Sequence, residues 1–367
     1  MNVKCSHCGV VKELTPQVYK CPCGGAWEFI ERNEFDLGLI DKNSYSIFRY
    51  KNFLGLEFDE STIDLGIGWT PIVKKKIIGY DVMLKMDFLA PTGSYKDRGT
   101  CITINILASQ GVKNIVDDSS GNAGASMSAF ANAAGMSADI FVPAYCSPAK
   151  KTQIKVYGSN IHLVEGERIR ATEAAIAMLD EDHVYASHAY HPGFIMGQQT
   201  VAWEIWEQLL GKLPEAIIIP VAQGGNFLGM WYGFRRLLHD GHIKRIPKLI
   251  AVQSANVCPV VNAFLMGKKT VTPVMPANTV AEGVAVSNPV RGERILQAIY
   301  ETGGFAIAVD DQSVIEAQSQ LAKMGIWIEV TSATVIAALF ELRGMLDKRE
   351  TIMLSLTASG LKTMGVH

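Results

Sequence analysis

Lys96 is the residue of this sequence whose setting points most directly to chemistry. It follows a loop marked by proline and glycine and precedes a helical pattern, in the segment APTGSYKDRG at 90–99. Because the positive end of a helix dipole disfavours an ammonium group, we expect a lowered pKa for this lysine. A neutral amine can condense with a carbonyl carbon. The alternative is a charged surface triplet, Lys-Asp-Arg, that merely opens a helix.

Two glycine-containing segments each follow an apolar run and open a helical pattern. SSGNAGAS begins at Ser119, and its free backbone N–H groups suit an anion such as a carboxylate. Capping of the helix by Ser119 or Ser120 is the alternative. PVAQGGNF begins at Pro220 and suits a phosphate, the alternative being a tight turn without a ligand. A further segment, SLTASG from Ser355, places hydroxyl groups at a strand end, as ordinary turns also do.

The N-terminal cysteines form two closely spaced pairs, Cys5 with Cys8 and Cys21 with Cys23. Two such pairs on turns can present four thiolates to zinc, so we expect a closed, structural site. The second pair has the spacing CxC instead of the commoner CxxC, and a ribbon with free thiols is the alternative. We expect His7 to be exposed and not bound to metal.

Short apolar runs alternate with helical patterns from about residue 80 onward. The alternation predicts mostly parallel, doubly wound sheets whose ligands bind at the carboxyl ends of the strands. The predicted strands are 82–86, 114–118, 138–142, 160–164, 216–220, 249–253, 305–309 and 351–356. Helical patterns cover 122–134, 167–180, 197–210, 312–324 and 332–346.

The composition is that of a globular protein. Of 367 residues, 48% are hydrophobic and 19% charged, and the net charge is -2. Such a balance is not typical of a disordered chain and gives no reason to expect nucleic acid or an anionic membrane as partner. We see no apolar run of the ~18 residues that a membrane span needs. An odd number of cysteines, 7, without a secretion signal favours the reducing cytoplasm.

Taken in order, PTGSYKDRG, SSGNAGAS, Gly-Gly-Asn and LTASG resemble the fold type II enzymes of pyridoxal phosphate, and among them the threonine synthase branch. GWTPIV at 68–73, LTASGLK at 356–362 and the cysteine segment also fit. The resemblance implies two doubly wound α/β domains, an amino-acid substrate and a homodimer. Its implied divisions are a zinc-ribbon-like segment at 1–32, a large cofactor-binding domain at 45–99 and 191–367, and a small, mobile domain at 100–190.

The resemblance also assigns roles to individual residues. Lys96 would hold the cofactor aldehyde, Asn122 would bond the 3′ oxygen of the ring, and Thr357 would meet the pyridine nitrogen. A neutral hydroxyl at that nitrogen favours elimination or replacement at the β or γ carbon. The cofactor phosphate would lie in the turn of Gly224, Gly225, Asn226 and Phe227, with Gln223 at its edge. The substrate would contact Ser94, Ser119, Ser120, Gly121 and Ala123.

The segment HAYHPGFIMGQ at 188–198 departs from the family pattern. Phe194 stands where threonine synthases carry an arginine that grips the substrate phosphate, and Met196 stands in place of a glutamate. Ala123 likewise replaces a common threonine. Because a phenyl ring cannot replace a guanidinium fork, either another cation serves or the substrate is not phosphohomoserine. The candidate cations are Lys150 and Lys151. His188 and His191 are candidates for substrate contact or acid–base work, or are polar loop residues.

Several functions therefore remain open at this point. The first is threonine synthase, which eliminates phosphate at Cγ and adds water at Cβ. Others are a serine/threonine dehydratase or ammonia-lyase and a β-replacement synthase. A non-catalytic relative would keep the fold as an interaction module, but the presence of Lys96 argues against it.

Overall fold

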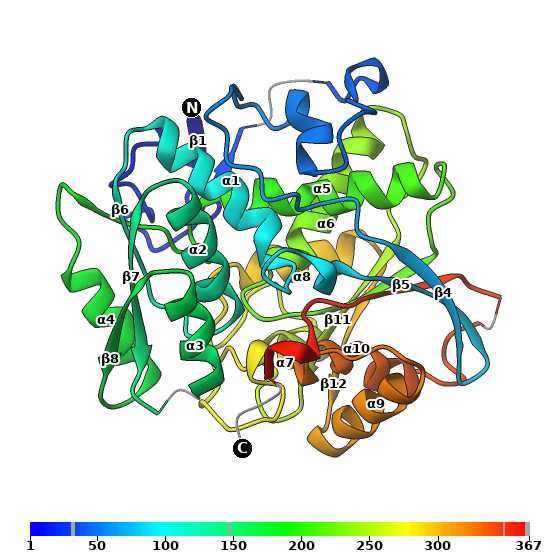
Figure 1. The fold of residues 1–367 in the computed structure, drawn as a ribbon. Coiled ribbons are helices and arrows are strands. Elements are labelled where there is room, and N and C mark those ends of the chain that lie inside the picture. Colours follow the sequence, from blue (N-terminus) through cyan, green and yellow to red (C-terminus); the bar gives the residue numbers. More distant parts are fainter. Residues whose placement is uncertain (31–33, 146–147, 348, 364–367) are drawn as a thin grey trace. The chain divides into compact units, whose positions relative to one another are not determined.

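The computed structural model describes residues 1–30, 34–145, 148–347 and 349–363 (Figure 1). The chain divides into two compact units. Unit 1 comprises Met1–Ile67, Ala90–Gly197 and Lys362–His367, and unit 2 comprises Gly68–Leu89 and Gln198–Leu361. These boundaries group residues differently from the functional domains expected from the sequence, and the mobility of 100–190 stays a prediction.

Unit 1 is built on a four-stranded parallel sheet with the order β8-β7-β6-β9. Its strands are β6 (Asn114–Asp117), β7 (Ser137–Pro143), β8 (Asn160–Val164) and β9 (His183–Tyr185). The first three coincide with predicted strands. The fourth is only three residues long and too short for its alternation to stand out in the sequence.

Helices cover both faces of this sheet. They are α1 (Lys96–Ser109), α2 (Asn122–Ala133), α3 (Pro148–Val156) and α4 (Arg168–Ala177), and α5 (Pro192–Gln208) begins in the same unit. Gly124 of α2 lies beside Ile140 of β7, whereas Ala171 and Ala175 of α4 cluster with Phe141. Neighbouring residues of a strand point to opposite faces, so α2 and α4 lie on opposite sides, as doubly wound topology requires.

Unit 2 contains a six-stranded mixed sheet with the order β12-β11-β10-β13-β5-β4. Its strands are β4 (Ile72–Ile77), β5 (Tyr80–Lys85), β10 (Ala216–Pro220), β11 (Lys248–Ser254), β12 (Phe305–Val309) and β13 (Ile352–Ser355). All neighbours are parallel except the hairpin of β4 and β5. Both turn residues of that hairpin, Ile78 and Gly79, have positive φ, which matches the twist of paired strands. The edge strand β4 was not predicted because its three lysines hide the apolar pattern, although lysines commonly protect sheet edges.

The helices of unit 2 are α6 (Gly225–His239), α7 (Pro259–Leu265), α8 (Gly292–Glu301), α9 (Asp311–Lys323) and α10 (Val330–Glu341). Helix α10 packs across the central strands and carries α9 on its outer side. Its buried side chains join Ile218, Ile250 and Leu354 in one apolar cluster. Helices α6 and α8 contact the same strands, so the central strands are buried between helices.

The N-terminal segment forms a small antiparallel sheet with the order β2-β1-β3. Its strands are β1 (Asn2–Cys5), β2 (Val11–Glu13) and β3 (Trp27–Phe29). Within the part of the chain that the structure describes, no helix is both long and apolar enough to cross a membrane.

Candidate active site

Lys96 is the first residue of α1, as the sequence predicts. Its side chain is half-buried, and its Nζ lies 4.7 Å from the ring centre of Tyr95 and 5.6 Å from that of Phe194. Beside it, Ser94 is fully buried, and its Oγ has no hydrogen-bond partner among the described residues. The loop thus offers one amine and one unused hydroxyl next to each other.

The loop before Lys96 is held by buried polar contacts. Asp97 accepts hydrogen bonds from the backbone N–H and the hydroxyl of Thr92, at 2.7 Å and 2.6 Å. The carbonyl oxygen of Thr92 in turn accepts from Gln153 at 2.9 Å and from Lys362 at 2.8 Å. Burial raises the pKa of Asp97, and the hydrogen bonds from Ser126 and Thr92 oppose that effect. These contacts fix the position at which α1 begins.

Phe194 is fully buried where α1 and α5 cross. A Cβ on Gly99 would lie 2.5 Å from the Phe194 ring, and a Cβ on Gly197 would lie 2.0 Å from the carbonyl oxygen of Arg98. The two helices can approach this closely only because both positions are glycine. Phe194 therefore packs as an apolar wedge under Lys96, and the polar grip expected from the family pattern is missing there.

The segment 119–123 leads from β6 into α2. Gly121 is the N-cap of α2, so neither Ser119 nor Ser120 caps the helix. A Cβ on Gly124 would lie 1.8 Å from the carbonyl oxygen of Ser119, so this glycine is needed for the turn to fold back on the helix. Asn122 is the first helical residue, and its side chain is partly exposed.

Two buried carboxyl groups precede that segment, and the sequence analysis did not single them out. Arg168 Nη1 lies 3.1 Å from Asp118 Oδ2, and the Thr172 hydroxyl donates to the same oxygen. The Tyr185 hydroxyl donates to Asp118 Oδ1 at 2.9 Å. Burial raises the pKa of Asp118, but these partners hold it below its ordinary value. For Asp117, burial and the neighbouring charge of Asp118 raise the pKa to about 7.

The two candidate histidines lie in different surroundings. The side chain of His188 is partly exposed, but its Nδ1 is buried and has no hydrogen-bond partner among the described residues. Burial, with the positive charge of Lys96, lowers the pKa of His188 to about 3, so the ring is neutral at pH 7. His191 is buried, and its Nδ1 accepts a hydrogen bond from the backbone N–H of Gly193 at 3.1 Å.

The loop from β10 into α6 belongs to unit 2. Gly224 is the N-cap of α6 with φ of 87°, and a Cβ there would lie 2.6 Å from Ile295 Cδ1. Asn226 donates to the Ser355 hydroxyl at 2.9 Å, while its buried Oδ1 has no partner among the described residues. Gln223 Oε1 accepts from the backbone of Val290 at 2.9 Å. A glycine cradle at a helix N-terminus and an unused amide oxygen fit an anionic ligand.

The rest of the predicted site in unit 2 lies close to the same elements. Gly225 and Phe227 are buried in the first turn of α6. Thr357 is buried just after β13, and its backbone N–H donates to the Ser332 hydroxyl at 2.7 Å. The side chain of Lys150 lies outside the described residues, and that of Lys151 is partly buried on α3.

The four cysteines converge as predicted. Their Sγ atoms all lie within 4.8 Å of one another, with 3.4 Å between Cys5 and Cys23 and 3.7 Å between Cys8 and Cys21. Zn–S bonds of about 2.3 Å in a tetrahedron require sulfur separations of about 3.8 Å. The cluster therefore fits a zinc ion. His7 is exposed and lies outside the cluster, as expected.

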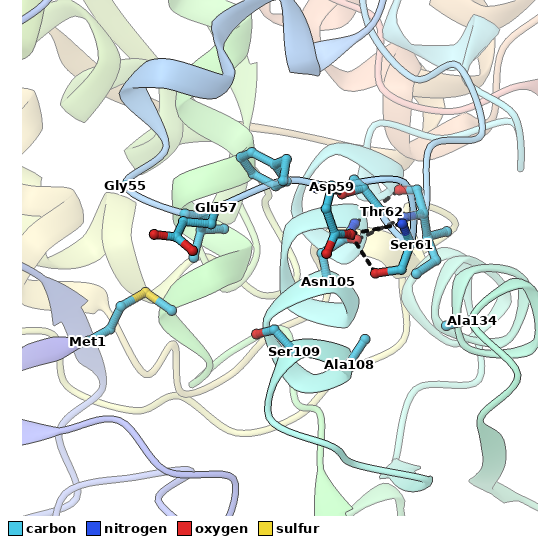
Figure 2. A pocket seen from close by; sticks show the side chains of 13 residues that line it. Met1, Gly55, Glu57, Asp59, Ser61, Thr62, Asn105, Ala108, Ser109 and Ala134 are labelled. Atoms are coloured by element: carbon cyan, nitrogen blue, oxygen red, sulfur yellow. Dashed lines mark hydrogen bonds between the residues drawn. The ribbon is translucent and has the colours of Figure 1, made fainter.

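Figure 2 shows a cavity of about 600 Å³ in unit 1. It is lined by the segment 55–63, with Glu57 and Asp59, by Asn105 and Ser109 on the C-terminal half of α1, and by neighbouring residues. None of the predicted site residues that the structure describes lines it.

A family model described as pyridoxal-phosphate dependent enzyme matches residues 63–358. This chain belongs to that family. Within it, the chain is 31% identical to the threonine synthase of Methanocaldococcus jannaschii, over 99% of this chain and 93% of that protein. It is 29% identical to the threonine synthase of Methanosarcina acetivorans, over 98% of this chain and 92% of that protein. The resemblance predicted from the motifs is confirmed.

Solved structures of this enzyme family share the fold. A bacterial-type match, the threonine deaminase of T.th., superposes with a TM-score of 0.68 at 24% identity, covering 79% of this chain and 92% of its own. Maize serine racemase superposes with a TM-score of 0.69 at 21% identity, covering 80% and 88%. The predicted α/β fold of fold type II enzymes is thus confirmed.

Proposed function

We propose that this pyridoxal-phosphate dependent enzyme is a threonine synthase, which converts phosphohomoserine and water to threonine and phosphate. The observation that carries the proposal is the match to threonine synthases along nearly the whole chain, with a lysine at the start of α1. The order of the glycine-rich segments supports it.

Pyridoxal phosphate supplies, when bound, an aldehyde for attachment and a ring that withdraws electrons from the substrate. Lys96 would hold the aldehyde and, once its amine is free, move a proton at Cα. The amine is half-buried between two aromatic rings, which limits contact with water. Because His188 is neutral at pH 7, it would not serve there as a general acid.

The remaining roles follow the family pattern residue by residue. In unit 2, Gly224, Gly225, Asn226 and Phe227, with Gln223, would hold the cofactor phosphate, and Thr357 would meet the ring nitrogen. The positive φ of Gly224 and the unused Oδ1 of Asn226 support the first assignment. In unit 1, Asn122 would bond the ring oxygen. Substrate contacts would come from Ser94, Ser119, Ser120, Gly121, Ala123, Lys150, His188 and His191.

A second candidate function is elimination from an unphosphorylated amino acid, as a serine/threonine dehydratase or ammonia-lyase performs. The buried, apolar Phe194 favours it, because this position lacks the guanidinium that would hold a phosphate. A β-replacement synthase would also use the same lysine.

Turnover measurements separate these functions. We expect the holoenzyme to release inorganic phosphate from phosphohomoserine and to form threonine in equal amount. Serine, threonine and O-phosphoserine should give slower release of ammonia or phosphate. Faster 2-oxo acid formation from serine or threonine than threonine formation from phosphohomoserine would establish the lyase function instead.

The cysteine cluster is proposed to bind one structural zinc through Cys5, Cys8, Cys21 and Cys23. We expect about one zinc per chain in protein purified without chelator, and Cys8→Ser should lower both zinc content and Tm. Cys258→Ser, which changes a cysteine outside the cluster, is the control. Full zinc content in Cys8→Ser would contradict this ligand set.

Two further expectations are also proposals. Cysteine usage supports a cytoplasmic location, and the family resemblance supports a homodimer. Sedimentation of the holoenzyme at a mass near 40.0 kDa would contradict the dimer.

A further inference from the structure

Arg168 begins α4 at the edge of the sheet where the 119–123 segment also begins. The strands β6, β8 and β9 are parallel neighbours or share a neighbour, so their carboxyl ends meet at one edge. Asp118 directly follows β6, and α4 follows β8. The contact of 3.1 Å between Arg168 and Asp118 joins these two segments within unit 1.

The guanidinium group of Arg168 is oriented but not used up. Its Nη1 donates to Asp118 and to the Thr172 hydroxyl, both at 3.1 Å. The Tyr185 hydroxyl holds the other carboxylate oxygen of Asp118. Nε and Nη2 have no hydrogen-bond partner among the described residues, and 47% of the side chain is exposed. A fixed guanidinium with free, parallel N–H groups is suited to a phosphate or carboxylate.

The surroundings connect Arg168 with Lys96. The positive charges of both residues contribute to the lowered pKa of His188, after burial, so both lie near that imidazole. Other cations of this region are less suitable. Arg98 is fully buried, and Arg170 is exposed and paired with Glu173 at 3.0 Å.

We propose that Arg168 binds the phosphate group of the substrate, the role that the family pattern gives to an arginine at the position of Phe194. Asp118 then acts as a positioning residue that holds the guanidinium at the mouth of the 119–123 segment. This inference rests on the proposed function in one respect, namely that the substrate carries a distal anionic group.

The test compares Arg168→Gln with Arg170→Gln in the holoenzyme. A charge-assisted pair of hydrogen bonds corresponds to roughly a tenfold to hundredfold change in affinity. We expect Arg168→Gln to raise KM for phosphohomoserine and Kd for inorganic phosphate by that factor, with kcat changed less. Calorimetric titration with inorganic phosphate gives the Kd independently of turnover. Arg170→Gln should change neither value.

Asp118→Asn distinguishes binding from a merely structural role. If Arg168 binds phosphate, removing the competing carboxylate charge should leave the phosphate affinity equal or higher. If Arg168 only ties α4 to the loop, Asp118→Asn should weaken phosphate binding as much as Arg168→Gln does, and the proposal is overturned. Tyr185→Phe, which loosens Asp118 without changing charge, replaces this variant if it fails to fold, and should then weaken phosphate binding far less than Arg168→Gln.

Failure of the proposed function has a different signature. A wild-type enzyme that binds inorganic phosphate through Arg168 but does not turn over phosphohomoserine would keep this anion site and change only the substrate. An unchanged Kd in Arg168→Gln would remove the site, whatever the substrate is.

Discussion

The carboxyl ends of β6 and β10 lead into helices by similar turns with opposite chemistry. After β10 the chain reads Pro220, Val221 and Ala222 before the glycines, with no charged residue. At the end of β6 two buried carboxyl groups, Asp117 and Asp118, precede the serines. Both turns expose the N-terminus of a helix, but only the turn after β6 is surrounded by titratable groups.

This difference teaches how one fold can hold two ligands with different demands. A cofactor phosphate is the same in every member of the family, and a rigid turn of backbone amides is enough for it. Substrates vary, and charged side chains around a turn can change specificity without changing the backbone. We therefore expect changes near β6 to alter substrate use and pH dependence, and changes near β10 to alter cofactor affinity.

Replacement of Lys96 has the largest expected effect. In Lys96→Ala the amine that would attach the cofactor and move the proton is gone, so activity should fall at least about a thousandfold. The turn after β10 is unchanged, so the cofactor should still bind, but without a covalent link. Borohydride reduction followed by peptide mapping measures the link, with exposed Lys113→Ala as the control. A labelled lysine other than Lys96 in the wild type would contradict the assignment.

Phe194→Arg should have the next largest effect. The sequence alone suggested that an arginine here would improve the use of phosphorylated substrates. The ring is fully buried against Gly99, so a guanidinium would be buried without a partner and next to Lys96. Such a charge costs about 3–5 kcal/mol. We expect a strongly lowered Tm with no gain on phosphohomoserine, and Phe194→Leu as a control should lose less. A stable, more active Phe194→Arg would show that the helices can separate.

Local pattern was enough to predict much of the fold. The runs 160–164, 216–220 and 305–309 are strands with those limits, because their apolar residues are continuous and bounded by turns. The edge strand β4 was missed because its lysines face solvent. The position of Lys96 and the convergence of the cysteines were also predicted, since both depend on residues close in sequence.

Contacts between distant segments could not be predicted in this way. Asp118 and Arg168 lie 50 residues apart, and their pairing depends on the order of strands in the sheet. The burial of Phe194 depends on two helices crossing at Gly99 and Gly197. A pair of acidic residues at the end of an apolar strand was the one local signal that could have marked the first of these contacts.

Asp117→Asn should change the pH dependence of stability. Folded Asp117 keeps its proton up to about pH 7, whereas the unfolded chain loses it near 3.8. Between these values the folded state binds more protons, so the free energy of unfolding falls as pH rises. The loss amounts to a few kcal/mol at pH 8. Denaturant unfolding at pH 5 to 8 should show a smaller decline in the variant than in wild type. Exposed Asp182→Asn is the control, and equal slopes in all three proteins would contradict the raised pKa.

Gly224→Ala and Gly121→Ala compare the two turns directly and have the smallest expected effects. Gly224 has φ of 87°, and its added Cβ would lie 2.6 Å from Ile295 Cδ1, a flexible side-chain end. The left-handed conformation costs an alanine about 1–2 kcal/mol, so the cofactor Kd should rise about tenfold. Gly121 has φ of −109°, and no atom lies within 4 Å of its added Cβ. Gly121→Ala should therefore leave cofactor affinity unchanged, as measured by absorbance titration of apoenzyme. If Gly121→Ala weakens the cofactor as much as Gly224→Ala does, the assignment of the cofactor phosphate to the β10 turn is wrong.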